Sequence, residues 1–524
     1  MILGDSPRAP AEMQSGQRRV TVDDLFRRAV ARRPDAIALA DAPNRGGFTD
    51  GAPLRLTYAE ADRMVSAIAG RLRLMGLPTD ALVGIQLPNT VENILTLLGV
   101  LRAGMIAAPL PLLWRQADAA AALARVGAKA FISCGHVGKF EQCQFALRIA
   151  AEVFSIRYVC GFGADLPDGV VPLDDLFTTA KLDPIPTLER DADAAAHLAV
   201  VTFEMGEAGP VPVARRHLEL LAGGMTVLLE SRLQQDANIL SALAPASFAG
   251  LCLTLMPWLV SGGTLALHHP FDAQVITRQL FDETCGTLIL PAPVALWPDQ
   301  AALLGPQRPA TLIAAWHGPE QLAASAEWRE PDTALVDVSI FGEAGLIAAR
   351  RGADGRPVPL PLGPVTAPFG VAGEMTVAEI DATATNTLAL GGPMVPRHAF
   401  PSGIERTDQP HFEIGRDGFV DTRYPCSVDT AADTVMVSGP LSGIVNVGGY
   451  RLSLGSLLKT IRRVDPGATL AVLPDALIGW RLTGIAADPA AMRFALNAAG
   501  LNPLVVAAFA DRCDEDKHEP AVAV

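Results

Sequence analysis

Lysine is scarce in this 524-residue chain and is missing from its middle. The five lysines stand at positions 129, 139, 181, 459 and 517. The stretch without lysine, between positions 181 and 459, includes segment 199–224. Its sequence predicts a strand, a Gly/Pro-rich turn and a helix. Phosphate-binding loops of this kind usually add a lysine as a point charge. Here the nearby cations are Arg215 and Arg216, both past the turn, so the segment predicts a nucleotide loop without its cation.

Positive charge is short throughout the chain. The formal net charge of −14 argues against nucleic acid as a partner, because phosphate backbones attract basic surfaces. Half of the residues are hydrophobic and 19% are charged, which provides for a large core and excludes disorder.

Cysteine and apolar patterns exclude several further classes. The seven cysteines form no CxxC pair, and no zinc-type spacing appears, so we predict reduced thiols, no metal site and a cytoplasmic protein. The first 20 residues lack the apolar run of a signal peptide. Residues 237–267 carry no charge, but Pro245 and Pro257 interrupt them, which favours buried core over a transmembrane segment.

The order of elements predicts an α/β fold with mainly parallel sheets. Thr21 with Asp24 and Thr57 with Glu60 predict capped helices, and Asn89 with Glu92 predicts a third. Strands and helices alternate up to about residue 342. From about residue 350 to 421, short β segments rich in Gly and Pro predict a barrel-like or antiparallel unit. The end predicts a β-hairpin, a helix and a strand at 504–512, a small α+β module.

Residues 56–112 carry the most specific pattern of the chain. A helix after 56-LTYAEA-61 is followed by a strand, the triplet 87-LPN-89, a second helix, Gly104 and 109-PLPL-112. This order resembles the adenylate-forming superfamily, which comprises acyl-CoA and aryl-CoA synthetases and adenylation domains. The resemblance extends over roughly residues 20 to 510.

The resemblance implies a fold and an activity. It implies a large N-terminal domain of two sheets and a distorted β-barrel, here residues 1–438, and a small C-terminal domain, here 439–524. It implies that ATP, with Mg²⁺, converts a carboxylic or fatty acid into an acyl-adenylate. The acyl group then passes to CoA or a carrier thiol. No cofactor follows from the residues themselves.

The phosphate loop of that family falls on residues 203–213 of this chain. The corresponding loop residues are Glu204, Gly206, Glu207, Gly209, Pro210 and Val211. Val211 stands in the lysine position, and the two glutamates bring negative charge to the place of the phosphates. The alternative interpretation is a plain strand-to-helix turn.

Other nucleotide-site equivalents are altered in the same way. The resemblance places Gly318 and Pro319 near the adenine, and Phe341, Gly342 and Glu343 in the element that holds the adenine and Mg²⁺. Tyr424 stands near the position of the ribose aspartate. Arg451 matches the loop after the hinge, where the hinge arginine itself is Pro440.

The acyl pocket and the C-terminal lysine are less well marked. Ser247 and Gly250 are candidates for the pocket wall. Lys517 lacks the Gly-rich turn of the family's catalytic lysine and is interpreted as a tail charge. Arg215, Arg216 and Lys517 are the cations open to replace the missing lysines.

Two functional classes remain open from the sequence. One is an acyl-CoA synthetase-like ligase with impaired or lost adenylation. The other is a non-catalytic relative that binds an acyl or acyl-CoA ligand or a protein partner. A filled space between segments 203–213 and 341–345 would favour the second class, and an open space would favour the first.

Overall fold

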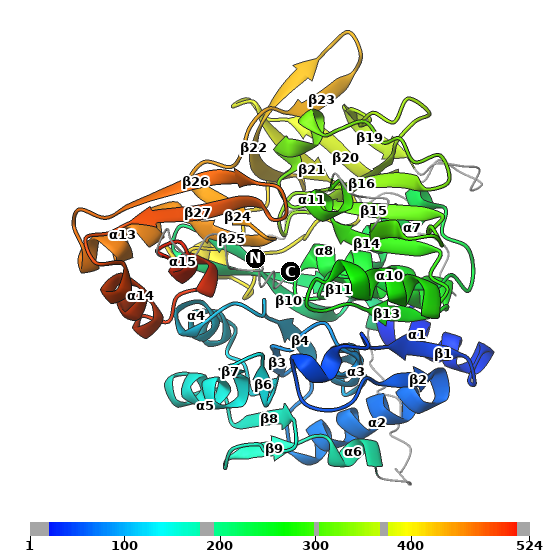
Figure 1. Ribbon diagram of the computed structural model, residues 1–524, viewed down its shortest axis with the longest axis vertical. Coiled ribbons are helices and arrows are strands. Elements are labelled where there is room, and N and C mark those ends of the chain that lie inside the picture. The colour runs from blue at the N-terminus through cyan, green and yellow to red at the C-terminus, as the bar shows by residue number, and fades with distance from the viewer. Residues whose placement is uncertain (1–19, 179–192, 298–302, 367–375, 511–524) are drawn as a thin grey trace, which may run out of the picture.

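Two mainly parallel sheets form the centre of the computed structural model, which describes residues 20–178, 193–297, 303–366 and 376–510 (Figure 1). The seven-stranded sheet has the order β11-β10-β4-β3-β5-β8-β9. Its strands are β3 (Leu82–Ile85), β4 (Ile106–Pro109), β5 (Ala130–Cys134), β8 (Tyr158–Phe162), β9 (Val170–Pro172), β10 (Leu198–Gly206) and β11 (Gly209–Arg216). All neighbours run parallel except β10 and β11.

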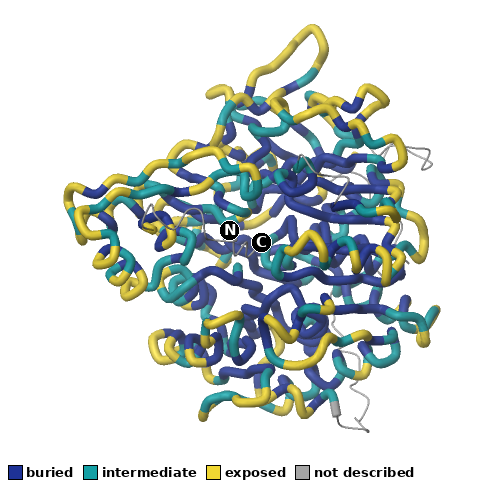
Figure 2. Tube along the Cα trace, in the orientation of Figure 1, coloured by how far each residue is buried: buried dark blue, intermediate teal, exposed yellow. Residues whose placement is uncertain are grey.

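The eight-stranded sheet has the order β17-β16-β15-β14-β12-β13-β1-β2 and is antiparallel at both edges. Its strands are β1 (Ile37–Ala40), β2 (Arg55–Thr57), β12 (Ile239–Ser241), β13 (Leu265–Leu267), β14 (Thr287–Pro291), β15 (Thr311–Trp316), β16 (Ala334–Ile340) and β17 (Leu346–Arg350). The buried parts of the trace concentrate in these two sheets (Figure 2). The predicted α/β class with mainly parallel sheets is confirmed, as expected for strands buried on both faces.

Two of the three predicted helix caps are confirmed. Helix α1 (Val22–Arg32) and helix α2 (Tyr58–Leu74) begin with capping boxes at Thr21 and Thr57. Helix α3 (Val91–Arg102) does not use Asn89, since its N-cap is Thr90 without a side-chain bond. The Asn89 amide instead donates to the Ser241 carbonyl at 3.0 Å, linking the two sheets.

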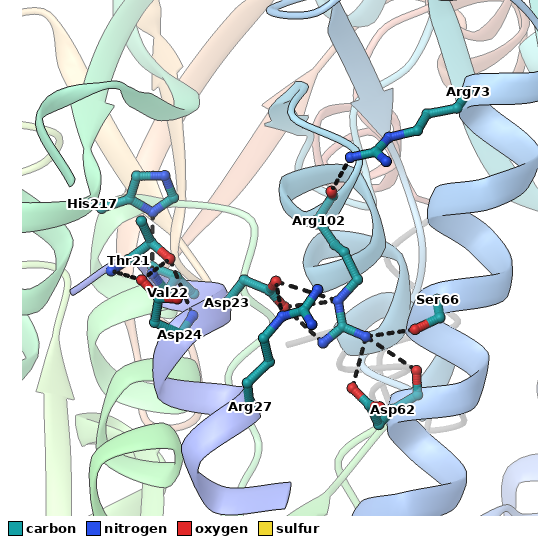
Figure 3. Close-up of polar contacts among 10 residues, drawn as sticks. All are labelled: Thr21, Val22, Asp23, Asp24, Arg27, Asp62, Ser66, Arg73, Arg102 and His217. Atoms are coloured by element: carbon teal, nitrogen blue, oxygen red, sulfur yellow. Dashed lines mark hydrogen bonds and ion pairs between the residues drawn. The ribbon is translucent and has the colours of Figure 1, made fainter. Parts of the chain in front are cut away.

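Helix α1 is held at its N-terminal end by contacts on two sides (Figure 3). The buried Arg102 guanidinium contacts Asp23 at 2.8 Å and Asp62 at 2.7 Å. The Val22 N–H donates to Nδ1 of His217 at 3.2 Å. His217 is the first residue of α7 (His217–Ser231), so the N-terminal helix is bonded directly to the helix behind the β10–β11 hairpin.

The predicted barrel-like unit is an open antiparallel sheet of six strands in the order β18-β23-β22-β21-β20-β19. Its strands are β18 (Leu360–Pro361), β19 (Gly363–Thr366), β20 (Thr376–Ala382), β21 (Thr387–Gly391), β22 (Val420–Asp429) and β23 (Thr434–Val437). β18 and β19 do not pair across the described residues, so the sheet does not close into a barrel there.

The C-terminal part carries its own small core. Its elements are β24 (Ile444–Val447), β25 (Tyr450–Ser453), α13 (Leu454–Val464), β26 (Thr469–Asp475), β27 (Gly479–Ile485), α14 (Pro489–Ala498) and α15 (Pro503–Ala507). Val445 and buried residues that follow it form a cluster separate from the main core. Leu441 and Ile444, just before it, still belong to the main core. The predicted strand at 504–512 is wrong. Pro503 begins a short helix there, capped by the Asn502 side chain.

The uncharged segment 237–267 lies in the core, where Leu251–Leu255 and Trp258 are buried. Within the described ranges, no helix has the length and apolar character needed to cross a membrane. Lys517 lies outside those ranges.

Candidate functional site

The predicted phosphate loop is the tip of a tight β-hairpin. Gly206 of β10 pairs with Gly209 of β11, so Glu207 and Ala208 alone make the turn. Gly209 has a φ of 91°, a conformation that favours glycine. The predicted sequence of strand, turn and helix is therefore wrong: a second strand stands between the turn and α7.

The carbonyl groups of this turn already face a cation. Arg125 donates to the Ala208 carbonyl at 2.9 Å and also to the Pro210 carbonyl. Phosphate cradles instead present consecutive N–H groups to their ligand. The hairpin tip thus displays a geometry suited to a guanidinium rather than to an anion.

Glu204 joins this hairpin to two other parts of the chain. One of its carboxylate oxygens accepts from the Glu343 N–H at 2.7 Å, and the other accepts from Arg451 Nη1 at 2.6 Å. Val211 lies directly opposite Glu204 in the ladder. The position that the family resemblance assigns to lysine therefore faces the same side of the sheet as this carboxylate.

Gly342 makes the contact between Glu204 and Arg451 possible. It lies after β16 with a φ of 58°. A Cβ at this position would overlap the Glu204 carboxylate and the Arg451 guanidinium. The missing side chain leaves the space in which the ion pair forms.

Glu343 points into the protein and is bonded at both oxygens. It accepts from the Thr202 hydroxyl at 2.5 Å and from the Phe248 N–H at 3.1 Å. Burial raises the pKa of Glu343 to about 7, and the nearby Glu204 carboxylate adds to this rise. The Thr202 hydrogen bond and the Arg215 charge oppose it. Glu343 is therefore a carboxyl group poised between its neutral and charged forms at neutral pH.

Arg451 comes from β25 of the C-terminal part and completes the contact. Its second nitrogen donates to the Tyr424 hydroxyl at 3.0 Å. Burial lowers the pKa of Arg451, but Glu204, Tyr424 and Glu343 together outweigh burial, and the net shift of the pKa is upward. Tyr424 in turn packs edge-on against Phe341, with ring centroids 5.7 Å apart, and burial raises the pKa of its hydroxyl to about 12.

Arg215 lies on the other side of Glu343, and no carboxylate of the described residues is bonded to it. Its guanidinium donates to the carbonyl groups of Met394 and Glu343, and to that of Ala344 at 3.3 Å. It stacks 3.9 Å from the Phe248 ring centroid. Burial lowers the pKa of this fully buried side chain. Arg215 therefore ties backbone carbonyls together, whereas the half-buried Arg216 is the N-cap of α7.

Ser247 and Gly250 serve the local backbone. The Ser247 hydroxyl accepts from the Gly250 N–H at 3.1 Å and caps the short helix α8 (Phe248–Gly250). A Cβ on Gly250 would overlap the Ala244 carbonyl. Ser247 also contributes to the wall of the pocket between Glu204, Glu343 and Arg451.

The pocket at this junction is small. It has a volume of about 70 Å³, and its walls include Trp114, Phe203, Tyr450 and His317. Ligand pockets for drug-sized molecules are typically ~300–1,000 Å³. Gly318 lies in the wall of a neighbouring cavity of about 20 Å³, and Pro319 is buried at the start of the 3₁₀ turn η4 (Pro319–Ala324). No cluster of three metal-binding side chains occurs in the parts of the chain that the structure describes.

The structure thus brings together Glu204, Phe341, Gly342, Glu343, Tyr424 and Arg451. Sequence reasoning missed Thr202 and the pairing of Glu204 with Arg451. The signal available in the sequence was Glu204, in a position where the family has a hydroxyl residue, together with Arg451, which matches the family. Residues 247 positions apart give no local pattern that joins them.

Comparison with known proteins places this chain in a family. Residues 26–296, more than half of the chain, match the family of AMP-binding enzymes. Cyclosporin synthetase of Tolypocladium inflatum is 27% identical over 285 residues, which cover 52% of this chain and 2% of that protein. Malformin synthetase of Aspergillus vadensis is 25% identical over 427 residues, covering 76% of this chain and 8% of its own length. The chain therefore spans a small part of the curated relatives it matches.

Solved structures support the same assignment at the level of the fold. The amide bond synthetase McbA of Marinactinospora thermotolerans superimposes with a TM-score of 0.68 at 18% identity, covering 93% of this chain and 94% of that one. An artificially fused adenylation–PCP di-domain, NpsA-ThdA from Klebsiella oxytoca, gives 0.64 at 16% identity, covering 92% of each. Together with the match over residues 26–296, the two sheets and the hairpin identify the chain as a member of the family of AMP-binding enzymes.

Proposed function

We propose that this chain is a member of the family that has lost carboxylate adenylation and acts by binding a ligand or a protein partner. The observation that supports this proposal is the Arg451–Glu204 ion pair, which lies between the hairpin and segment 341–345 beside a pocket of only about 70 Å³. An ATP-dependent ligase needs that space for phosphates.

The charges of the site disfavour a triphosphate. Glu204 adds a carboxylate, and Arg451 is already bonded to it. A carboxylate about 4 Å from a phosphate costs roughly 1–4 kcal/mol in semi-exposed surroundings. Glu343 is buried, and its carboxyl group is turned to the Thr202 hydroxyl and the Phe248 N–H, which disfavours it as a Mg²⁺ ligand in this arrangement. The side chains present do not fit ATP with Mg²⁺ in this arrangement, so we derive no catalytic step through them.

A second candidate function is a ligase whose C-terminal segment moves away from the hairpin before ATP binds. Arg451 belongs to the C-terminal segment, which has its own core cluster, so the ion pair joins two separately packed parts. The change from one core to the other falls between Ile444 and Val445, a few residues past the boundary at 438–439 that the sequence predicted, and we propose this stretch as the point of movement. Relatives of this chain include nonribosomal peptide and cyclodepsipeptide synthetases, which supports an amino- or hydroxy-acid substrate for such a ligase beside the acyl substrate that the sequence suggested.

Calorimetric titration with ATP, with and without Mg²⁺, separates the two candidates. The proposal predicts no binding at sub-millimolar Kd, that is, an affinity weaker than about −4 kcal/mol. The same titration on Arg451→Ala tests whether the ion pair alone blocks ATP. ATP binding by the parent chain, with carboxylate-dependent pyrophosphate exchange, would overturn the proposal in favour of the ligase. Binding by Arg451→Ala alone would assign the block to the ion pair.

A further inference from the structure

The C-terminal segment touches the rest of the chain at a second place, the start of helix α4 (Gln116–Val126). Helix α14 of that segment ends beside α4 (Figure 1), and the carbonyl of Gly500 accepts from the Ala117 N–H at 3.2 Å. Ala117 is the second residue of α4. The contact therefore joins the C-terminal end of one helix to the N-terminal end of another.

Helix α4 has no side-chain cap of its own within the described ranges. Its N-cap residue is Arg115, whose guanidinium donates instead to the carbonyl groups of Leu112 and Trp114. The first N–H groups of a helix lack partners within the helix and carry partial positive charge. The Gly500 carbonyl lies at the negative end of α14, so it satisfies one of these groups and complements their charge.

Gly500 is the residue that allows this close approach. It follows α14 with a φ of 67° and closes a Schellman motif. In that motif the Gly500 N–H donates to the Asn497 carbonyl, and the Leu501 N–H donates to the Leu496 carbonyl. A Cβ on Gly500 would lie 2.5 Å from the Cβ of Gln116. A side chain at this position must therefore push the end of α14 away from α4.

The other end of α4 is fixed to the hairpin. Arg125, one residue before the end of the helix, donates to the Ala208 and Pro210 carbonyl groups at the hairpin tip. A helix of 11 residues is about 16 Å long. Helix α4 thus connects the C-terminal segment to the hairpin by a second route, beside the direct Arg451–Glu204 ion pair.

We infer that α4 is a latch, which holds the C-terminal segment closed over the hairpin through the Gly500 carbonyl. The latch sets the position from which Arg451 reaches Glu204. The inference deepens the proposed function and rests on it in one respect, that the closed segment keeps ATP from the hairpin. The latch itself acts without nucleotide.

Hydrogen exchange of the full chain, measured by mass spectrometry without nucleotide, tests the latch. The test variant is Gly500→Asn, because asparagine tolerates a positive φ and the main change is then the added side chain. The matched control is Gly127→Asn. Gly127 closes the same motif at the end of α4 with a φ of 63°, and a Cβ there would meet no described atom within 4 Å.

We expect Gly500→Asn to speed exchange about tenfold in the first turn of α4 and in β25, because both lose a partner when the segment moves away. Gly127→Asn should leave both at the rate of the parent chain. Gln116→Gly removes the Cβ that the new side chain meets. The double variant Gly500→Asn, Gln116→Gly should therefore recover most of the protection.

Three results would overturn the inference. One is equal exchange in Gly500→Asn and Gly127→Asn, and another is faster exchange confined to the first turn of α4. The third is faster exchange throughout the C-terminal core, including Leu496, because Gly500 would then serve the fold of the segment rather than its position. ATP titration of the parent chain tests the proposed function separately, so either one can fail while the other stands.

Discussion

Two buried arginines flank Glu343, and their partners differ. Within the described ranges, Arg215 bonds only backbone carbonyls and stacks on Phe248. Arg451 bonds the Glu204 carboxylate and the Tyr424 hydroxyl. Both belong to a site in which the family resemblance assigns a lysine to the phosphates. The difference teaches that an arginine near a nucleotide site is no substitute for a lysine unless its fork is free. Here the Arg215 guanidinium is bonded to backbone carbonyls, and the Arg451 guanidinium is bonded to Glu204.

Removing Arg215 should have the largest effect on this comparison. Arg215→Met keeps an apolar stem over Phe248 but leaves three carbonyl groups without their donor. We expect a loss of about 3–5 kcal/mol in the free energy of unfolding, measured by urea denaturation. Arg278→Met, which removes an exposed pair with Asp282, is the control and should change it by less than about 1 kcal/mol. Equal effects would show that Arg215 contributes no more than a surface residue.

The raised pKa of Glu343 gives the next effect. The unfolded chain loses this proton near pH 4.5 and the folded chain near pH 7, so the folded state binds the proton more tightly between these values. The stabilisation is complete below about pH 4.5 and is lost as pH rises to about 7, by up to about 3 kcal/mol. Unfolding measured at pH 5 and pH 7.5, on the parent chain and on Glu343→Gln, checks this. The variant should lose that part of the pH dependence, and an unchanged profile would contradict the assignment.

The coupling between Glu204 and Arg451 should be smaller. A double-mutant cycle with Glu204→Gln and Arg451→Met isolates it from other contacts. We expect a coupling free energy of about 1–2 kcal/mol. It should be no larger, because Glu204 keeps its hydrogen bond from the Glu343 N–H whether or not Arg451 is replaced. Strictly additive effects would mean that the pair does not hold the two parts together.

Restoring the lysine alone should have the smallest effect. Val211→Lys places an ammonium opposite Glu204 in the hairpin ladder, where the two charges pair with each other. ATP binding, measured by calorimetry, should therefore stay at the level of the parent chain. The double variant Glu204→Ser, Val211→Lys removes the carboxylate that would pair with the new lysine. A gain in ATP affinity seen already in the single variant Val211→Lys would contradict this account.

The sequence predicted the parts of the fold that depend on local patterns. Thr21 and Thr57 cap their helices as expected, because a capping box is complete within four residues. The hairpin was missed because Gly209, Pro210 and Pro212 are typical of turns, although an antiparallel edge strand accommodates them. The C-terminal helix was missed because its residues are typical of a strand. Val505 and Val506 favour strands, but Pro503 and the Asn502 cap begin a helix.

The site was predictable as a location and not as a set of contacts. The altered residues were placed correctly in one region, since Glu204, Glu343, Tyr424 and Arg451 meet. Which side chain neutralises which depends on how the C-terminal segment packs against the hairpin. That packing is set by long-range contacts, and no spacing in the sequence encodes it.

The place of β1 has a consequence for synthesis. Strand β1 pairs with β13, so Leu39 lies beside Leu265 in the finished sheet. The N-terminal strand must therefore wait on the ribosome until more than two hundred further residues have emerged. Chains that depend on such distant pairings fold slowly, and the unpaired edge of β1 is exposed meanwhile to wrong partners. We expect nascent chains that stop before β13 to need a chaperone on that edge, whatever the finished protein binds.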